Sequence, residues 1–133
     1  MQRHVIVLGM LSSLWGALSM LIGLSMLLLA AGALAPLLEP QGPVIAFAAG
    51  VTAAAFALAG AFALLWGGAH VWAGVMLRKR VPLGRLLSLA LAVVNLLVLP
   101  FGTAFGAYAL WVLLANDGRR LFEPQILSAA APR

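Results

Sequence analysis

The chain consists of long apolar stretches separated by short segments that carry proline or charge. The first stretch ends before Pro36, the second ends at Arg78-Lys79-Arg80, and the last two meet at Pro100. Proline and charge interrupt regular apolar helices, so these segments are expected to be connections. The pattern predicts an all-α fold of two hairpins, with helices at about residues 5–34, 44–77, 83–99 and 101–115.

Two further features concern the ends of these elements. Pro82 is expected to occupy the first turn of the third helix, where its missing N–H costs nothing. Leu121 and Phe122 are interpreted as a short amphipathic stub in the membrane interface. We expect a single domain over residues 1–122 and a mobile cytoplasmic tail at residues 123–133.

Composition indicates the solvent in which these helices fold. The chain has 133 residues, of which 65% are hydrophobic and 8% are charged, and its mean hydropathy is +1.13. A soluble domain carries about 25% charged residues, so the lipid bilayer is the expected environment. The first apolar run greatly exceeds the apolar core of about 7 to 15 residues found in a signal peptide, which predicts a retained helix. The expected fold class is therefore an integral membrane four-helix bundle.

The basic residues predict the orientation of this bundle. They lie near the N-terminus, around the middle connection and towards the C-terminus: Arg3; Arg78, Lys79, Arg80 and Arg85; Arg119, Arg120 and Arg133. Short cytoplasmic segments retain lysine and arginine, so both termini and the middle connection are predicted to be cytoplasmic. The same residues form no basic patch with interleaved aromatic residues, which argues against nucleic acid as a partner.

Small residues recur every seven positions in both long stretches. They are Gly9, Gly16, Gly23 and Ala30 in the first stretch and Ala46, Ala53, Gly60, Gly67 and Gly74 in the second. Lipid provides no hydrophobic drive for helix association, and small residues that let backbones approach are the usual substitute. We predict that the two helices pack along this seam, with the left-handed crossing near +20° that a seven-residue period implies.

The short helices carry a second small-residue pattern. One face of the third helix contains Gly84, Ser88, Ala92 and Asn95, and the fourth helix contains Gly102, Gly106 and Ala109. We expect these two faces to meet. Asn95 is interpreted as hydrogen bonding to Thr103, Tyr108 or a carbonyl near Pro100, a bond worth about 0.6 to 2 kcal/mol; contact with a ligand or ion is the alternative.

Chemically reactive residues are scarce. No Asp, Glu, Lys or Arg lies deep in a predicted span, and the chain has no cysteine. Intramembrane charge usually marks proton and ion pathways, so its absence argues against a proton-coupled transporter. We expect no catalytic, cofactor or metal site. His70 is interpreted as a hydrogen-bonded packing residue, with a proton relay or a haem ligand as alternatives.

Several segments resemble a set of small bacterial four-span inner-membrane proteins. The resemblance rests on residues 73–82, on Asn95-Leu96, and on residues 100–114, which contain the turn Pro100-Phe101-Gly102-Thr103 and the run from Tyr108 to Trp111. Such proteins often have tryptophan after the proline of the middle connection, where Leu83 stands here. The resemblance implies four spans and a bacterial inner-membrane location, and it names no reaction.

Together these features predict a non-enzymatic membrane protein that acts as an accessory or scaffold subunit. Its partner would be another copy of itself or another membrane protein; a small oligomeric passive channel or carrier is the alternative. The outer end of the long hairpin is expected to contact this partner through Leu34, Leu37, Leu38, Val44, Ile45 and Phe47. The alternative is a kinked or folded-back loop that covers these residues without a partner. The residues predicted to have a structural or interaction role are Asn95, Gly102, Thr103, Gly106, Tyr108, Trp111 and His70.

Overall fold

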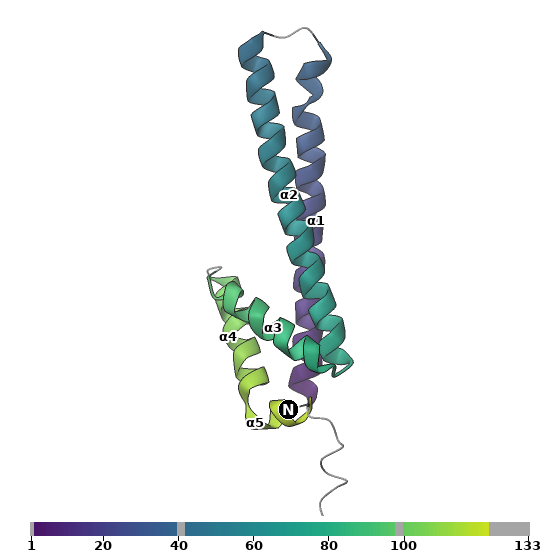
Figure 1. The fold of residues 1–133 in the computed structure, drawn as a ribbon, viewed down its shortest axis with the longest axis vertical. Coiled ribbons are helices and arrows are strands. Elements are labelled where there is room, and N and C mark those ends of the chain that lie inside the picture. Colours follow the sequence, from purple (N-terminus) through teal and green to yellow (C-terminus); the bar gives the residue numbers. More distant parts are fainter. Residues whose placement is uncertain (1, 40–41, 98–99, 123–133) are drawn as a thin grey trace, which may run out of the picture. The chain divides into compact units, whose positions relative to one another are not determined.

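The fold is all-α. The computed structural model describes residues 2–39, 42–97 and 100–122, of which 90% are helical (Figure 1). The elements are α1 (Gln2–Ala33), the 3₁₀ turn η1 (Ala35–Leu38), α2 (Pro43–Arg78), α3 (Pro82–Asn95), α4 (Phe101–Leu114) and α5 (Asn116–Arg120). The predicted tail at residues 123–133 lies outside the described residues.

Two helices are long and apolar, and two are short and apolar. By length and composition, α1 with the 3₁₀ turn and α2 could each cross a membrane, and only 11% of the most apolar 18-residue window of each is buried within the protein. The predicted ends of these helices agree with the structure to within about three residues. They are set by proline and charge, since α1 ends before Pro36 and α2 runs from Pro43 to Arg78.

The connection between α2 and α3 is a tight helix cap. Arg80 has a positive φ of 55°. Its N–H donates to the Leu77 carbonyl at 3.0 Å, and the Val81 N–H donates to the Met76 carbonyl at 3.1 Å. These two bonds form a Schellman motif, which satisfies carbonyls that a helix end would otherwise leave open. Pro82 then begins α3, as predicted.

The third helix is shorter than predicted. α3 ends at Asn95 and not at Leu99, and Leu96 and Leu97 already form a turn. The apolar run continues without a break through Leu99, so hydrophobicity alone does not separate helix from turn there. The predicted end at Leu99 itself lies outside the described residues.

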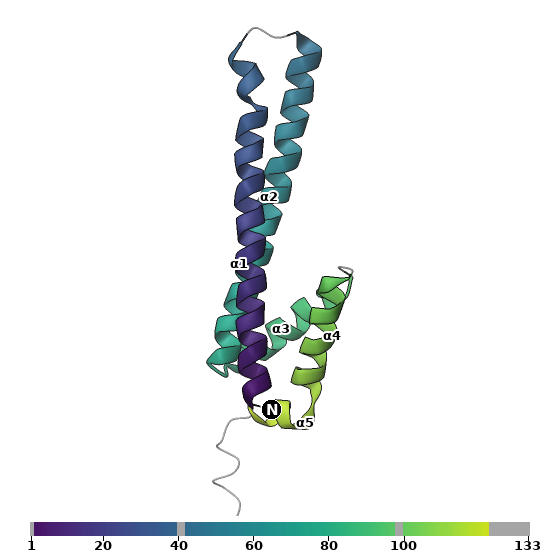
Figure 2. The same ribbon diagram turned by 180° about the vertical axis from the view of Figure 1, so that it is seen from behind.

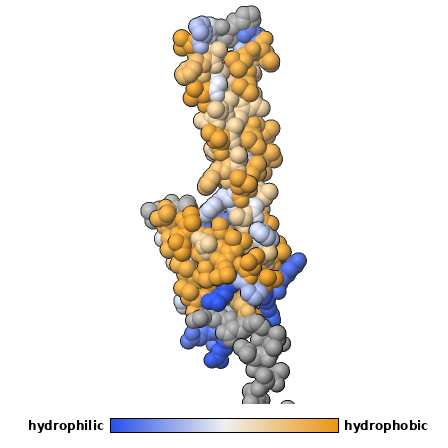
Figure 3. Space-filling view, viewed as in Figure 1, coloured by the Kyte–Doolittle hydropathy of each residue, from blue (hydrophilic) through white to orange (hydrophobic). Residues whose placement is uncertain are grey.

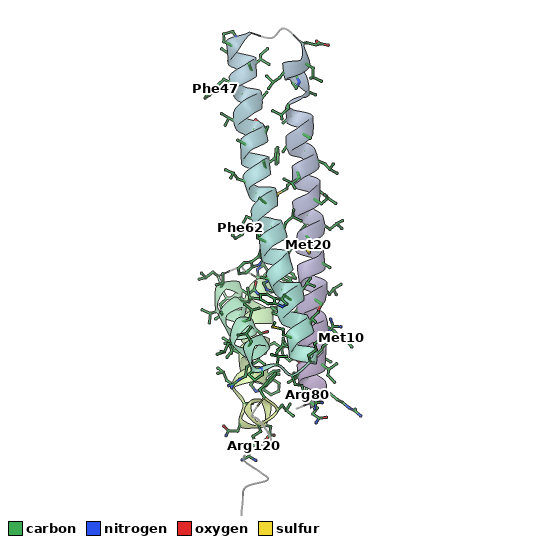
Figure 4. All side chains as sticks on the ribbon, turned by 45° about the vertical axis from the view of Figure 1, so that its right-hand side comes forward. Met10, Met20, Phe47, Phe62, Arg80 and Arg120 are labelled. Atoms are coloured by element: carbon green, nitrogen blue, oxygen red, sulfur yellow. The ribbon has the colours of Figure 1, made fainter. Side chains whose placement is uncertain are left out.

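The chain divides into two compact units. Unit 2, Leu14–Val71, contains antiparallel stretches of α1 and α2 that lie side by side in both views of the ribbon (Figures 1 and 2). Large apolar side chains cover its outside, as the apolar colour along the hairpin in Figure 3 shows. Figure 4 shows Phe47 and Phe62 projecting from α2 on the side away from α1.

Unit 1 comprises Met1–Ser13 and Trp72–Arg133. It contains a hydrophobic core formed by Val5, Leu8, Leu77, Ala92, Ala109, Val112, Leu113 and Phe122. Phe122 is buried in this core, so protein covers its side chain, and the predicted location of Leu121 and Phe122 at the membrane interface stays a prediction. Phe122 follows α5, which begins after Ala115 leaves the helical conformation of α4 and which has Gly118 directly against the Val112 carbonyl.

Candidate functional site

The small-residue seam of unit 2 brings two backbones into direct contact. A β-carbon built on Gly16 would lie 2.5 Å from the carbonyl oxygen of Gly67, and one built on Gly23 would lie 2.8 Å from that of Gly60. Real β-carbons essentially never come this close to another atom, so only glycine fits at these positions. The structure therefore confirms the predicted seam within this unit.

The seam pattern is also present in unit 1. A β-carbon on Gly9 would lie 2.9 Å from the Gly74 carbonyl oxygen. Polar side chains form hydrogen bonds beside this backbone contact. Ser13 Oγ donates to the Gly9 carbonyl at 2.9 Å, and Arg78 Nη2 donates to Ser13 Oγ at 3.2 Å. Arg78 Nε also donates to the Gly74 carbonyl at 3.3 Å. The basic end of α2 is thus tied to α1 by hydrogen bonds as well as by backbone packing.

The faces of α3 and α4 meet as predicted at their centre. A β-carbon on Gly106 would lie 2.5 Å from the Ala92 carbonyl oxygen. The sequence predicts the same contact for Gly84, but a β-carbon built on Gly84 would instead lie 2.6 Å from Met76 Cβ. The prediction is therefore wrong for Gly84, because the tight cap at Arg80 folds the start of α3 back onto the last turn of α2.

Two polar side chains of α3 are buried. Asn95, at the end of the helix, is fully buried, and Ser88, about two turns earlier on the same face, is nearly so. Thr103 Oγ1 donates to the Leu96 carbonyl at 3.0 Å, which satisfies a carbonyl released where α3 ends. The predicted hydrogen bond from Asn95 to Thr103, Tyr108 or a carbonyl stays a prediction.

Tyr108 and Trp111 of α4 meet a residue that the sequence did not single out as their partner. His4 Nδ1 lies 3.2 Å from the Tyr108 hydroxyl. The His4 ring also packs edge-on to Trp111, with 5.8 Å between ring centroids. The sequence indicates this cluster only through the three-residue spacing of Tyr108 and Trp111, which places both on one helical face. This aromatic cluster holds the start of α1 against α4 within unit 1.

His70 is fully buried and hydrogen bonded. Its Nδ1 donates to the Trp66 carbonyl one turn earlier in α2, at 3.1 Å, and the Trp66 ring lies 5.0 Å from the imidazole. These contacts agree with the predicted role of His70 as a packing residue. Among the described residues, no group of three or more His, Cys, Asp or Glu side chains is placed to hold a metal ion.

No family model, curated protein or solved structure matches this chain. The resemblance to small four-span inner-membrane proteins therefore stays a prediction.

Proposed function

We propose that the protein is a multi-pass component of a bacterial inner membrane and acts as a non-enzymatic accessory or scaffold subunit. Its helices form a membrane-embedded bundle of two hairpins with both termini in the cytoplasm. It works by packing against a second copy or another membrane protein. The observation that carries this proposal is the length of apolar surface on α2 and its exposure.

The apolar part of α2 is longer than lipid can cover. Residues 44–77 rise about 51 Å at 1.5 Å per residue, whereas the hydrocarbon core is about 30 Å thick. Transmembrane helices tilt by at most about 40°, and at that angle the stretch still spans about 39 Å. Because Arg78 anchors the cytoplasmic end of α2, the surplus extends beyond the opposite face of the core.

The residues at that outer end are apolar and exposed within the chain. Leu38 is 88% exposed, Val44 is 78% exposed and Phe47 is 75% exposed. Exposed apolar surface that lipid does not cover usually marks a protein contact. A protein partner at this end removes that surface from water, which supports a scaffold role.

Crosslinking tests the proposed contact. The chain has no cysteine, so single cysteines at Leu38 and Phe47 can be crosslinked in native membranes and the mass determined in mild detergent. Leu65→Cys, on an exposed position in the middle of α2, is the matched control and is expected to give much less product. A monomer with no crosslinked species at positions 38 and 47 would refute the scaffold role.

Two further measurements separate the remaining alternatives. Glu39→Cys is expected to react with an impermeant maleimide added outside intact cells, and Lys79→Cys is expected to react only after the membrane is opened. Labelling at position 79 from outside would overturn the orientation. Purified protein in liposomes is expected to conduct no small solute, and measurable flux would favour the passive channel or carrier.

A further inference from the structure

The α3–α4 hairpin is too short to cross a bilayer from the level at which it is anchored. Arg85 Nε donates to the Leu113 carbonyl at 3.2 Å, so the guanidinium of α3 lies beside the last turn of α4. From Arg85 to the end of α3 at Asn95 the helix rises only about 15 Å, and from Leu113 back to Phe101 it rises about 18 Å. Each distance is about half of a 30 Å hydrocarbon core.

The turn at the tip of this hairpin has the composition of a segment in lipid. Every residue from Leu96 to Phe101 is apolar, whereas the connection between α1 and α2 contains Glu39 and Gln41. A turn that emerges into water normally carries polar residues, because its backbone and side chains are solvated there. The connection of the long hairpin is therefore partly polar, whereas the turn of the short hairpin is apolar.

Three hydrogen bonds satisfy backbone groups of the described residues beside the tip. The Leu97 N–H donates to the Val94 carbonyl at 3.1 Å, and the Ala104 N–H donates to the Pro100 carbonyl at 3.3 Å. The Thr103 hydroxyl donates to the Leu96 carbonyl at 3.0 Å. Hydrocarbon offers no hydrogen-bond partners, so backbone groups at membrane depth need partners within the protein, and these three bonds supply some of them.

The outward face of the hairpin is apolar up to the tip. Leu86, Val93 and Val94 are exposed, and Leu97 at the turn is 81% exposed. In Figure 3 the strongly hydrophilic residues of unit 1 gather away from the α3–α4 turn, beside which the visible surface is apolar. The charged residues would lie at the membrane surface and the apolar turn in the hydrocarbon, because charge is costly inside the bilayer. This arrangement suits a hairpin that enters the membrane from one side.

We propose that the α3–α4 hairpin is re-entrant: it enters the bilayer from the cytoplasmic side, turns near the midplane and returns to the cytoplasm. The acyl chains of the cytoplasmic leaflet cover its exposed face. This inference rests on the proposed membrane location, and it replaces two predicted crossings with one half-depth loop. Only α1 and α2 then span the membrane.

Depth-dependent quenching tests the proposal in liposomes that contain brominated lipids. Single cysteines at the exposed positions Leu86, Ala90 and Leu97 are labelled with bimane. For a re-entrant hairpin the labels deepen in that order, and positions 86 and 97 differ in depth by up to about 16 Å. Quenching by midplane bromines is strongest at position 97, and aqueous iodide does not reach that label.

A hairpin that crosses the bilayer gives a different profile. Position 90 is then deepest, and positions 86 and 97 lie on opposite sides of the midplane, each within about 10 Å of it. Stronger midplane quenching at position 90 than at position 97 therefore overturns the proposal. Weak quenching at all three positions, as expected if protein covers the hairpin, also overturns it. Leu58→Cys, at an exposed position in the middle of α2, is the control: no bromolipid quenching there would refute the membrane location itself. Circular dichroism of each variant verifies that the helices are retained.

Discussion

Gly67 and Gly68 of α2 are adjacent in the chain but differ completely in surroundings. A β-carbon on Gly67 would lie 2.5 Å from the Gly16 carbonyl oxygen and 2.9 Å from the Met20 backbone nitrogen, whereas one on Gly68 would meet nothing within 4 Å. Gly67→Ala and Gly68→Ala therefore make the same chemical change at a closed and at an open position. We expect Gly67→Ala to weaken the contact between α1 and α2.

The magnitude follows from the distances. Ordinary van der Waals contact begins near 3.4 Å, so the Gly67 variant must separate the two backbones by roughly 0.9 Å, and overpacking of this kind costs about 1 to 3 kcal/mol. Alanine is also better than glycine in a helix by up to about 1 kcal/mol, equally at both positions. The free energy of unfolding should therefore be about 1 to 3 kcal/mol lower for Gly67→Ala than for Gly68→Ala.

Titration with SDS in mixed micelles, followed by tryptophan fluorescence, measures this difference. The double variant Gly16→Ala/Gly67→Ala extends the test, because both β-carbons force the same helix separation and the second should cost less than the first. Equal unfolding free energies for Gly67→Ala and Gly68→Ala would refute the conclusion that the seam depends on backbone contact.

Three further variants test individual contacts. Thr103→Val removes the hydroxyl that donates to the Leu96 carbonyl and should lower the free energy of unfolding, measured by the SDS titration, by about 1 kcal/mol. Thr103→Ser keeps a hydroxyl and should retain most of the wild-type free energy of unfolding. Arg80→Gly relieves a positive φ and should raise the thermal unfolding temperature by an amount equivalent to about 1 kcal/mol; the control Lys79→Gly, inside the cap, should not raise it. Asn95→Leu should leave membrane insertion unchanged but lower thermal stability in detergent by about 0.6 to 2 kcal/mol, and an identical melting curve would count against a hydrogen-bonding role.

The sequence predicts some elements well because they rest on strong local signals. Pro36, Pro43 and Arg78 mark the ends of the long helices, and the seven-residue spacing of glycine identifies the faces that pack in each unit. The contact between Gly106 and Ala92 follows from small-residue spacing on two short helices in the same way.

Other features depend on contacts that no local pattern encodes. Residues 96–99 are all apolar, so hydropathy does not mark the end of α3 at Asn95. Residues 116–118 resemble a helix terminator, yet α5 forms there because Gly118 allows its backbone to lie against Val112. The pairing of His4 with Tyr108 joins positions 104 residues apart, and a lone histidine near the start of a chain gives no sign of it.

The seven-residue repeat of the seam has a consequence for how the long helices find their alignment. Sliding one helix by seven residues, about 10.5 Å, would place Gly16 opposite Gly60 and Gly9 opposite Gly67, so glycine would again meet glycine. The seam thus determines how closely the helices approach, but alignments that differ by seven residues pack glycine against glycine equally well. Arg78 removes the degeneracy, since it donates to Ser13 in the observed alignment and a shift of seven residues would place it level with Ile6 or Met20. A single polar contact can therefore select one alignment among several that close packing alone would accept.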